Sequence, residues 1–295
     1  MFKGFNFAVC FIIGLVIASE AQITRHFEVV GNNEITLVNL SFSCYKGVTD
    51  VKRVYKGIPF NAHADLGKVN ILPTFTHHTK DGVLSADLEH KNVESESLSK
   101  NLSYRFFSGN DDDFDHKWQV GLDANYLYNL KLHFGIGKAR LDLSNLSISN
   151  CIIKTASTDV YLNYSKRTPN SVAMDSLLVS INMGSLYAEE LHFSNARELM
   201  LDVNYGSINL SFNDLMASPS NIRTMVGAGS VNIKLPPEDL PYIIKINSTA
   251  MCRTKIPSYL KEIDTKTYVS KGYRNDAKNL MTFMIDVSVG SVSLE

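Results

Sequence analysis

Apolar and polar residues alternate in one repeated frame beyond residue 125. Aligned on certain glycines, the chain carries apolar residues one, three, five and seven places before the glycine and two, four and six places after it. Five windows follow this frame, and only Thr224 and Glu190 depart from it. A sixth window fits with Thr158 in place of glycine. The five glycines are Gly137, Gly184, Gly206, Gly229 and Gly290.

Period-two alternation is the pattern of a β-strand with one buried face. The alternation shifts by one residue at each glycine, so the chain must bend or bulge there, and glycine adopts such a bend at the lowest cost. Successive bends are 21 to 26 residues apart, except for 61 residues between Gly229 and Gly290. This is the length of one turn of a β-solenoid. The pattern therefore predicts an all-β stack of two-strand turns.

In the clearest window, the frame predicts which side chains are inside the stack. We expect Leu201, Val203, Ile208 and Leu210 to be buried, and Asp202, Asn204 and Asn209 to be exposed.

The rest of the chain divides around this repeat. Residues 22–114 are predicted as an additional N-terminal β region, in which residues 60–71 fit the same frame around Gly67, and residues 115–295 as the repeat-built domain. Residues 91–113 are rich in Ser, Asn, Glu and Asp, which predicts a long surface loop. Residues 252–279 carry seven Lys or Arg residues among three tyrosines. We interpret this segment as a solvated excursion between the last two turns, with a binding edge as the alternative.

The first residues predict a secretory signal. Lys3 precedes an apolar run over residues 7–18, and Ser19 and Ala21 lie three and one places before Gln22, which predicts cleavage after Ala21. The run is shorter than the roughly 20 residues that a membrane span needs. We expect residues 1–21 to be removed and the mature protein to be extracytoplasmic, in the periplasm, on the cell surface or secreted, with no membrane span.

Four segments carry a family resemblance: LHFGIGKARLDLSNLSI, LDVNYGSINLSF, VGAGSVNIKLP and MIDVSVGSVSLE. They resemble the bacterial putative-adhesin and toast-rack families, which are related to the extracytoplasmic domain of cell-envelope stress-response proteins. The likeness covers roughly Trp118 to Glu295. It implies a right-handed β-helix-like stack, export and no catalytic activity. It transfers no active-site residue, because the shared motif is architectural.

Charge and cysteine content narrow the function classes. Lys+Arg (29) and Asp+Glu (30) nearly cancel, so the chain has no field that would gather nucleic acid or anionic lipid. Cleavage would leave three cysteines, which form either one disulfide or none; buried free thiols are the ordinary outcome in a chain with a large core. These cysteines are Cys44, Cys151 and Cys252.

Three groups of residues are of types that could carry chemistry. The repeated serines Ser185, Ser207, Ser230 and Ser291 indicate architecture, because a nucleophile needs a single positioned hydroxyl beside a base. His77 and His78 are expected as exposed loop histidines, with a metal site as the alternative. The acidic run Asp111, Asp113, Asp115 is expected as a solvated loop, with a calcium-steadied loop as the alternative. No catalytic, cofactor-binding or metal-ligating residue is predicted.

The outward positions beside the bends are mostly short and polar. Tyr187 is expected to be the only outward aromatic near them, so the outward face indicates no ligand class. The sequence thus favours an exported, non-catalytic β-solenoid that binds an envelope component or another protein. An envelope-stress sensor and a calcium-assisted, polysaccharide-cleaving β-helix enzyme are the alternatives.

The signal predicts the N-terminus of the mature protein. Mass spectrometry of the exported fraction should find Gln22 as the first residue, because the signal peptidase recognises the small residues at positions 19 and 21. An intact Met1 in that fraction would contradict cleavage.

Overall fold

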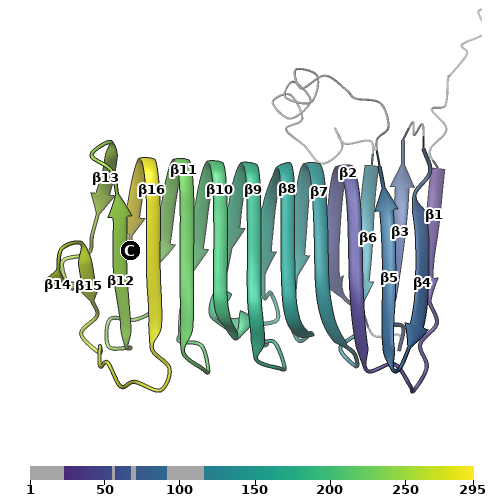
Figure 1. Ribbon diagram of the computed structural model, residues 1–295, viewed down its shortest axis with the longest axis horizontal. Helices are drawn as coiled ribbons and strands as arrows, with labels where there is room; N and C mark the ends of the chain where they lie inside the picture. The colour runs from purple at the N-terminus through teal and green to yellow at the C-terminus, as the bar shows by residue number, and fades with distance from the viewer. Residues whose placement is uncertain (1–22, 55–56, 68–70, 92–115) are drawn as a thin grey trace, which may run out of the picture.

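The computed structural model describes residues 23–54, 57–67, 71–91 and 116–295. These residues are nearly all β, as predicted, and form one long open sheet of 16 strands (Figure 1). The predicted signal at residues 1–21 lies outside the described residues, and the predicted loop at 91–113 does so beyond Lys91. No helix in the described part of the chain has the length and apolar character that a membrane crossing requires.

Seven long strands build the regular part of the stack. Each runs up one side of the molecule, bends near its middle and runs down the other side (Figure 1). We call the part before the bend the front arm and the part after it the back arm. The strands are β2 (Leu37–Arg53), β7 (Leu127–Asp142), β8 (Ser147–Asn163), β9 (Met174–Ala188), β10 (Ala196–Ser211), β11 (Ser220–Lys234) and β16 (Met281–Leu294).

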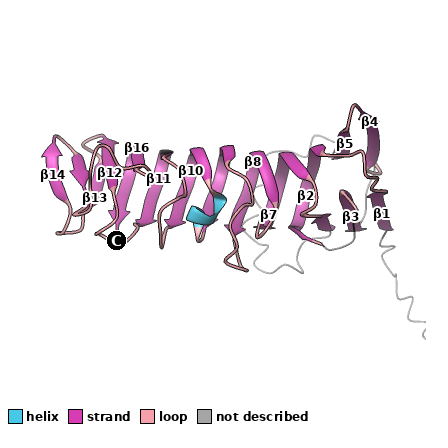
Figure 2. Cartoon of the chain, turned by 90° about the horizontal axis from the view of Figure 1, so that it is seen from below, coloured by secondary structure: helices cyan, strands magenta, loops and turns pink. Residues whose placement is uncertain are grey.

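The long strands pair in parallel in the order just given, and their bend residues are aligned. The predicted two-strand turn is therefore one continuous strand folded over, and the solenoid-like fold is confirmed. Figure 2 shows the stack from below, with the connecting loops and the short 3-10 helix η2 (Leu191–Ser194) along this edge. The right-handedness implied by the family resemblance stays a prediction.

The excursion between the last two turns covers the end of the stack. β11 and β16 are direct neighbours despite their separation in sequence. β12 (Tyr242–Ser248) and β13 (Cys252–Lys255) pair in parallel with the other edge of β16, and β14 (Lys261–Asp264) and β15 (Thr267–Val269) extend this sheet. The segment is thus a cap over an edge that would otherwise expose unpaired backbone groups.

The other end of the stack is also closed by separate short strands. β5 (Val83–His90) pairs with the front arm of β2, and β6 (His116–Leu122) with its back arm. Antiparallel strands follow: β4 (Thr74–Lys80) pairs with β5, β3 (Phe60–Leu66) pairs with β6, and β1 (Ile23–Val29) pairs with β3. A domain boundary near residue 115 stays a prediction, and the sheet is continuous across that position.

The frame around Gly67 is confirmed for the inward residues before the glycine, because Phe60, Ala62, Ala64 and Leu66 are buried, whereas residues 68–70 after it lie outside the described residues. Phe60–Leu66 is a single antiparallel strand, and the additional bend of the stack lies at Gly47, which is aligned with Gly137. Lys46, Thr49 and Arg53 occupy slots of the Gly47 window that are apolar in the other turns, so the window does not match the sequence frame.

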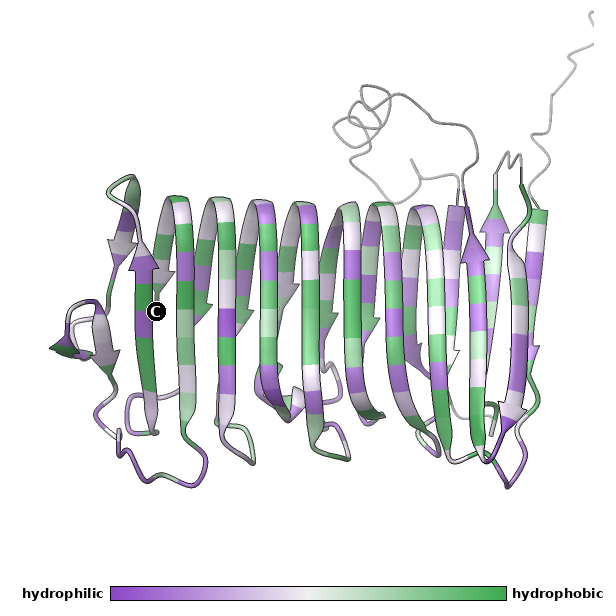
Figure 3. Cartoon of the chain, in the orientation of Figure 1, coloured by the Kyte–Doolittle hydropathy of each residue, from purple (hydrophilic) through white to green (hydrophobic). Residues whose placement is uncertain are grey.

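Burial follows the frame at the inward positions of the window around Gly206 away from the bend, whereas two outward residues and the position directly before the glycine differ from the expectation. Leu201, Val203, Ile208 and Leu210 are buried as predicted, and Figure 3 shows the apolar bands continuing from strand to strand. Asn204 is exposed, whereas Asp202 and Asn209 are half-buried. The expectation of an inward residue directly before the glycine is wrong, because Tyr205 is 60% exposed and Val289 44% exposed. The chain crosses between the two layers at this point, and inward packing resumes only after the bend.

The glycines at the bends form a close backbone ladder. Gly137, Gly184, Gly206, Gly229 and Gly290 have φ between +136° and +147°. A Cβ atom on Gly206 would lie 1.7 Å from the carbonyl oxygen of Gly184, and one on Gly229 would lie 1.6 Å from that of Gly206. The carbonyl oxygen of one glycine therefore occupies the space that a side chain would need on the aligned glycine of the next turn, so the spacing of these turns requires glycine.

Thr158 replaces this backbone arrangement with side-chain hydrogen bonds. Its φ is not positive, and strand pairing between β8 and β9 is interrupted at this bend. The Thr158 hydroxyl donates to the carbonyl oxygen of Gly135 at 3.1 Å, and the backbone N–H of Ser185 donates to Oδ1 of Asp159 at 2.8 Å. The window around Thr158 is therefore a turn of the stack in which side-chain hydrogen bonds replace the close glycine backbone contact at the bend.

The ladder predicts a large difference between two neighbouring substitutions. Gly206→Ala should destabilise the protein by about 2 to 6 kcal/mol, because it combines positive-φ strain with a backbone clash. Ser207→Ala removes hydroxyl contacts to Ser185 and Asn209 and should cost about 1 kcal/mol or less. Chemical denaturation of both variants beside the parent protein measures the difference. A Gly206→Ala variant as stable as the parent would refute the ladder.

Candidate binding face

Outward side chains on the back arms form rows across the stack. Because the strands are parallel and in register, residues at the same distance after the bend are neighbours, about 4.8 Å apart. We call the row three places after the bend the back-face row. It consists of Asp50, Arg140, Tyr161, Tyr187, Asn209, Asn232 and Ser293, with Lys255 of β13 beside Ser293.

Two tyrosines stack at the middle of the back-face row. The rings of Tyr161 and Tyr187 are nearly parallel, at 8°, with centroids 4.9 Å apart, and their residues are 37% and 38% exposed. Burial, reinforced by the charge of Asp159, raises the pKa of the Tyr161 phenol, so this group stays protonated. Beyond Tyr161 the row continues with an ion pair between Arg140 and Asp50, 3.2 Å apart. The stack is an exposed aromatic surface fixed by its own packing.

The expectation of a single outward aromatic near the bends is wrong, because Tyr161 and Tyr205 are also exposed. Tyr161 belongs to the turn at Thr158, where no glycine marks the bend. Its position three places after Thr158, equivalent to Tyr187 after Gly184, was the signal that could have found it.

Two asparagines continue the row on the other side of Tyr187. The side-chain amide of Asn232 donates to Oδ1 of Asn209 at 2.8 Å, and the Asn209 amide donates to Oγ of Ser207 at 2.9 Å. Each amide also donates a second hydrogen bond, Asn209 to the carbonyl oxygen of Leu186 and Asn232 to Oγ of Ser230, both at 3.4 Å. These contacts orient the groups and engage both hydrogens of each amide, so the remaining capacity is that of the two oxygens as acceptors.

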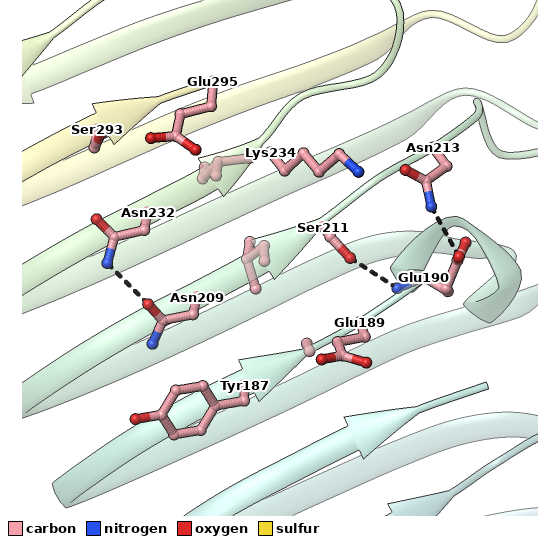
Figure 4. Close-up of a pocket in the computed structure, with 13 residues that line it drawn as sticks. Tyr187, Glu189, Glu190, Asn209, Ser211, Asn213, Asn232, Lys234, Ser293 and Glu295 are labelled. Atoms are coloured by element: carbon pink, nitrogen blue, oxygen red, sulfur yellow. Dashed lines mark hydrogen bonds between the residues drawn. The ribbon is translucent and has the colours of Figure 1, made fainter. Parts of the chain in front are cut away.

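An open cavity of about 480 Å³ lies over this part of the back arms (Figure 4). Tyr187 lies at one end of it, and the walls come from β9, β10, β11 and β16 together with the loop that contains Asn213. The polar side chains that line it are Glu189, Glu190, Asn209, Ser211, Asn213, Asn232, Lys234, Ser293 and Glu295. Among the described residues, neither histidine nor cysteine lines this cavity, and its polar groups are amides, hydroxyls, carboxylates and one amine.

Glu190 departs from the apolar frame and lies in the wall of this cavity. It has φ 52° and ψ 39°, a left-handed conformation that is costly for a residue other than glycine, where the chain leaves β9 for η2. Its Oε1 accepts a hydrogen bond from the Asn213 amide at 2.8 Å, and its backbone N–H donates to the Ser211 hydroxyl. Its buried Oε2 has no hydrogen-bond partner among the described residues, although Nε2 of His192 lies 3.6 Å away. Strained and incompletely satisfied polar groups of this kind concentrate at functional sites.

The predicted candidates lie apart from this cavity or play structural roles. Ser185, Ser207, Ser230 and Ser291 are aligned in one half-buried row directly after the bends, and Ser207 donates a hydrogen bond to Ser185 at 2.9 Å. His77 and His78 are exposed, as expected, but they lie in strand β4 and not in a loop. Asp111, Asp113 and Asp115 lie outside the described residues, and the part that is described contains no cluster of acidic, histidine or cysteine residues able to hold a metal ion.

The three cysteines are free thiols. Cys44 and Cys151 are buried, and burial raises the pKa of both to about 12. Cys252 is half-exposed in β13. The structure thus agrees with the free-thiol alternative and shows no disulfide among these residues.

A second polar cluster, which the sequence did not indicate, is buried near the N-terminal end of the stack, where β5 and β6 pair with β2. Tyr45 and His116 are hydrogen-bonded at 2.8 Å, and the backbone N–H of Gly67 donates to Nδ1 of His116. His90 contacts both rings and donates to the carbonyl oxygen of Ile71. Burial and the neighbouring His116 lower the pKa of His90 to about 4, so it is neutral at ordinary pH and serves packing.

Comparison with known proteins identifies no relative by sequence. No family model matches the chain, and no curated protein matches it. Two solved structures are similar in fold. A putative cell adhesion protein from Clostridium sporogenes has a TM-score of 0.45 at 12% identity, covering 93% of this chain and 99% of its own. A putative adhesin from Bacteroides fragilis has a TM-score of 0.36 at 13% identity, covering 94% of this chain and 98% of its own.

Both of these structures are of putative adhesion proteins, and the Gly-Ser segments of this chain resemble the putative-adhesin family. Neither similarity shows a toast-rack arrangement in this chain, and neither assigns a role to any of its residues. The solenoid fold itself follows from the strand register.

The stacked tyrosines predict a measurable energetic coupling. A double-mutant cycle of Tyr161→Ala and Tyr187→Ala should give a coupling of about 0.5 to 1.5 kcal/mol, because the two rings stabilise each other beyond the area that each buries. The cycle is measured by denaturation of the parent, both single variants and the double variant. Strict additivity would contradict the stack.

Proposed function

We propose that this protein is an exported, non-catalytic binding protein that contacts an extended component of the cell envelope through the back arms of its solenoid. One observation carries the proposal: a single cavity spans side chains from four neighbouring strands, β9, β10, β11 and β16. An extended ligand that crosses the strands meets a new turn of the stack about every 4.8 Å. Weak contacts to successive turns then add together.

The residue types at the cavity favour recognition over chemistry. Amides, hydroxyls and an aromatic ring dominate the part of the lining that belongs to the back-face row. Several of these side chains are already hydrogen-bonded to one another, so little conformational freedom is lost when a ligand binds. Export is supported by the signal-like residues 1–21.

Binding of the labelled, full-length protein to isolated cell envelopes tests the proposal. The variant Asn209→Arg/Asn232→Arg places bulky charges in the cavity and should weaken saturable binding at least tenfold. The matched control is Asp202→Arg/Met225→Arg, which changes two paired outward residues on the front arms of the same two strands. This control should bind like the parent.

Three results would contradict the proposal. These are a lack of saturable binding by the parent protein, equal loss in both double variants, and accumulation of the protein inside the cytoplasm. The release of soluble fragments from envelopes by the parent protein would contradict the non-catalytic part. Thermal unfolding of each variant shows that any loss of binding does not come from unfolding.

A further inference from the structure

We propose that the cavity on the back arms is a binding site for an extended, uncharged oligosaccharide that lies across β9, β10, β11 and β16. This inference rests on the proposed function, because it names the class of ligand for the same site. It follows from an aromatic wall, a row of oriented amides and the charge of the lining.

Tyr187 is the wall that a sugar ring would contact. Its neighbours in the back-face row are Tyr161 on one side and Asn209 on the other. Tyr161 covers one side of the Tyr187 ring, and of these two tyrosines only Tyr187 lines the cavity. Figure 4 shows its ring at the end of the cavity beside Asn209. The apolar C–H side of a pyranose packs well against an aromatic ring, while its hydroxyls stay free for hydrogen bonds.

The amides of Asn209 and Asn232 form the floor next to this wall. The hydrogens of both amides are engaged within the protein, and the amide oxygens keep lone pairs that can accept hydrogen bonds from sugar hydroxyls. Asn209 and Asn232 lie in adjacent strands, so the same group recurs at the strand spacing. Sugar units in an extended glycan recur at a similar interval, which lets consecutive rings make the same contacts.

The charge of the lining favours an uncharged chain. Arg167 lies 3.7 Å from Oε1 of Glu190 and Lys255 lies 3.4 Å from Oε1 of Glu295. Together with Lys234 they balance the three glutamates of the lining, so the site has no excess charge that would attract uronic acids, phosphates or sulfates. Carboxylates are strong acceptors for neutral hydroxyls. The buried Oε2 of Glu190 still lacks a hydrogen-bond donor among the described residues. This atom faces Nε2 of His192 at 3.6 Å inside the protein, so the carboxylates that a bound chain can reach are those of Glu189 and Glu295, which are exposed.

Two other hollows on the front arms fit this ligand less well. A cavity of about 630 Å³ beside β4 and β5 is lined by Asn39, Asn129 and Asn150 but by no tyrosine, phenylalanine or tryptophan. A smaller one of about 330 Å³ is lined by Met200 and Met225 and has no amide. The cavity on the back arms alone among these three combines an aromatic ring with amides.

Isothermal titration of the full-length protein with two neutral hexasaccharides whose units carry vicinal diols, cellohexaose and β-1,4-mannohexaose, tests the site. At least one should bind, whereas polygalacturonate should not. Tyr187→Ala should weaken the binding at least tenfold, and Tyr187→Phe should stay within threefold of the parent because the ring is kept. Tyr205→Ala is the matched control, since Tyr205 is an exposed tyrosine that does not line the cavity, and it should bind like the parent.

A second arm separates this inference from the proposed function. Envelopes are treated either with periodate, which cleaves the vicinal diols of sugars, or with protease. Loss of binding after periodate alone supports a glycan ligand. Loss after protease alone overturns the glycan inference and leaves envelope binding intact as a protein contact. Failure of both hexasaccharides to bind, preference for polygalacturonate, or equal effects of Tyr187→Ala and Tyr205→Ala would also overturn it.

Discussion

The structure depends on how closely the backbones approach one another at the bends. Gly206 and its counterparts bring each carbonyl to the place where a side chain would stand in the next turn. This contact keeps the bends in register, and the register brings the inward rows of successive turns together in one continuous core. The apolar rows supply most of the stabilisation, because burial of apolar area is the dominant favourable term in folding. The glycines determine which rows meet.

The same register determines the outward surface. A side chain three places after one bend can meet only the side chains at that offset in the turns on either side. An aromatic pair, an ion pair and an amide pair therefore arise wherever neighbouring turns carry matching residues, as at Tyr161 and Tyr187. The candidate site is in this sense a product of repetition. Its irregular part is Glu190, which adopts a strained conformation where β9 ends.

Much of the fold could be predicted from the sequence because the inward residues repeat in a strict frame. The prediction failed where other forces take over. Gly47 escaped notice because polar residues replace apolar ones in its window, and residues 60–66 matched the frame because any half-buried strand alternates. The exposure of Tyr205 could not be foreseen, since alternation does not show where a chain crosses between two layers. The candidate site was missed because the types of outward residues do not repeat from turn to turn; the hints were the equivalent positions of Tyr161 and Tyr187 after their bends and the departure of Glu190 from the frame.

The placement of β16 constrains the order in which the chain can fold. β16 follows β12 in the sequence but lies between β11 and β12 in space. During synthesis, β12 and β13 emerge before β16, so their native partner strand is missing until residues 281–294 arrive. Premature pairing of β12 with β11 would exclude β16 and leave its apolar residues, among them Phe283 and Ile285, without a core. The long segment between β13 and β16 lowers this risk, because it allows β12 and β13 to remain unpaired until β16 has joined β11. The cap therefore reaches its native place only after β16 has paired with β11.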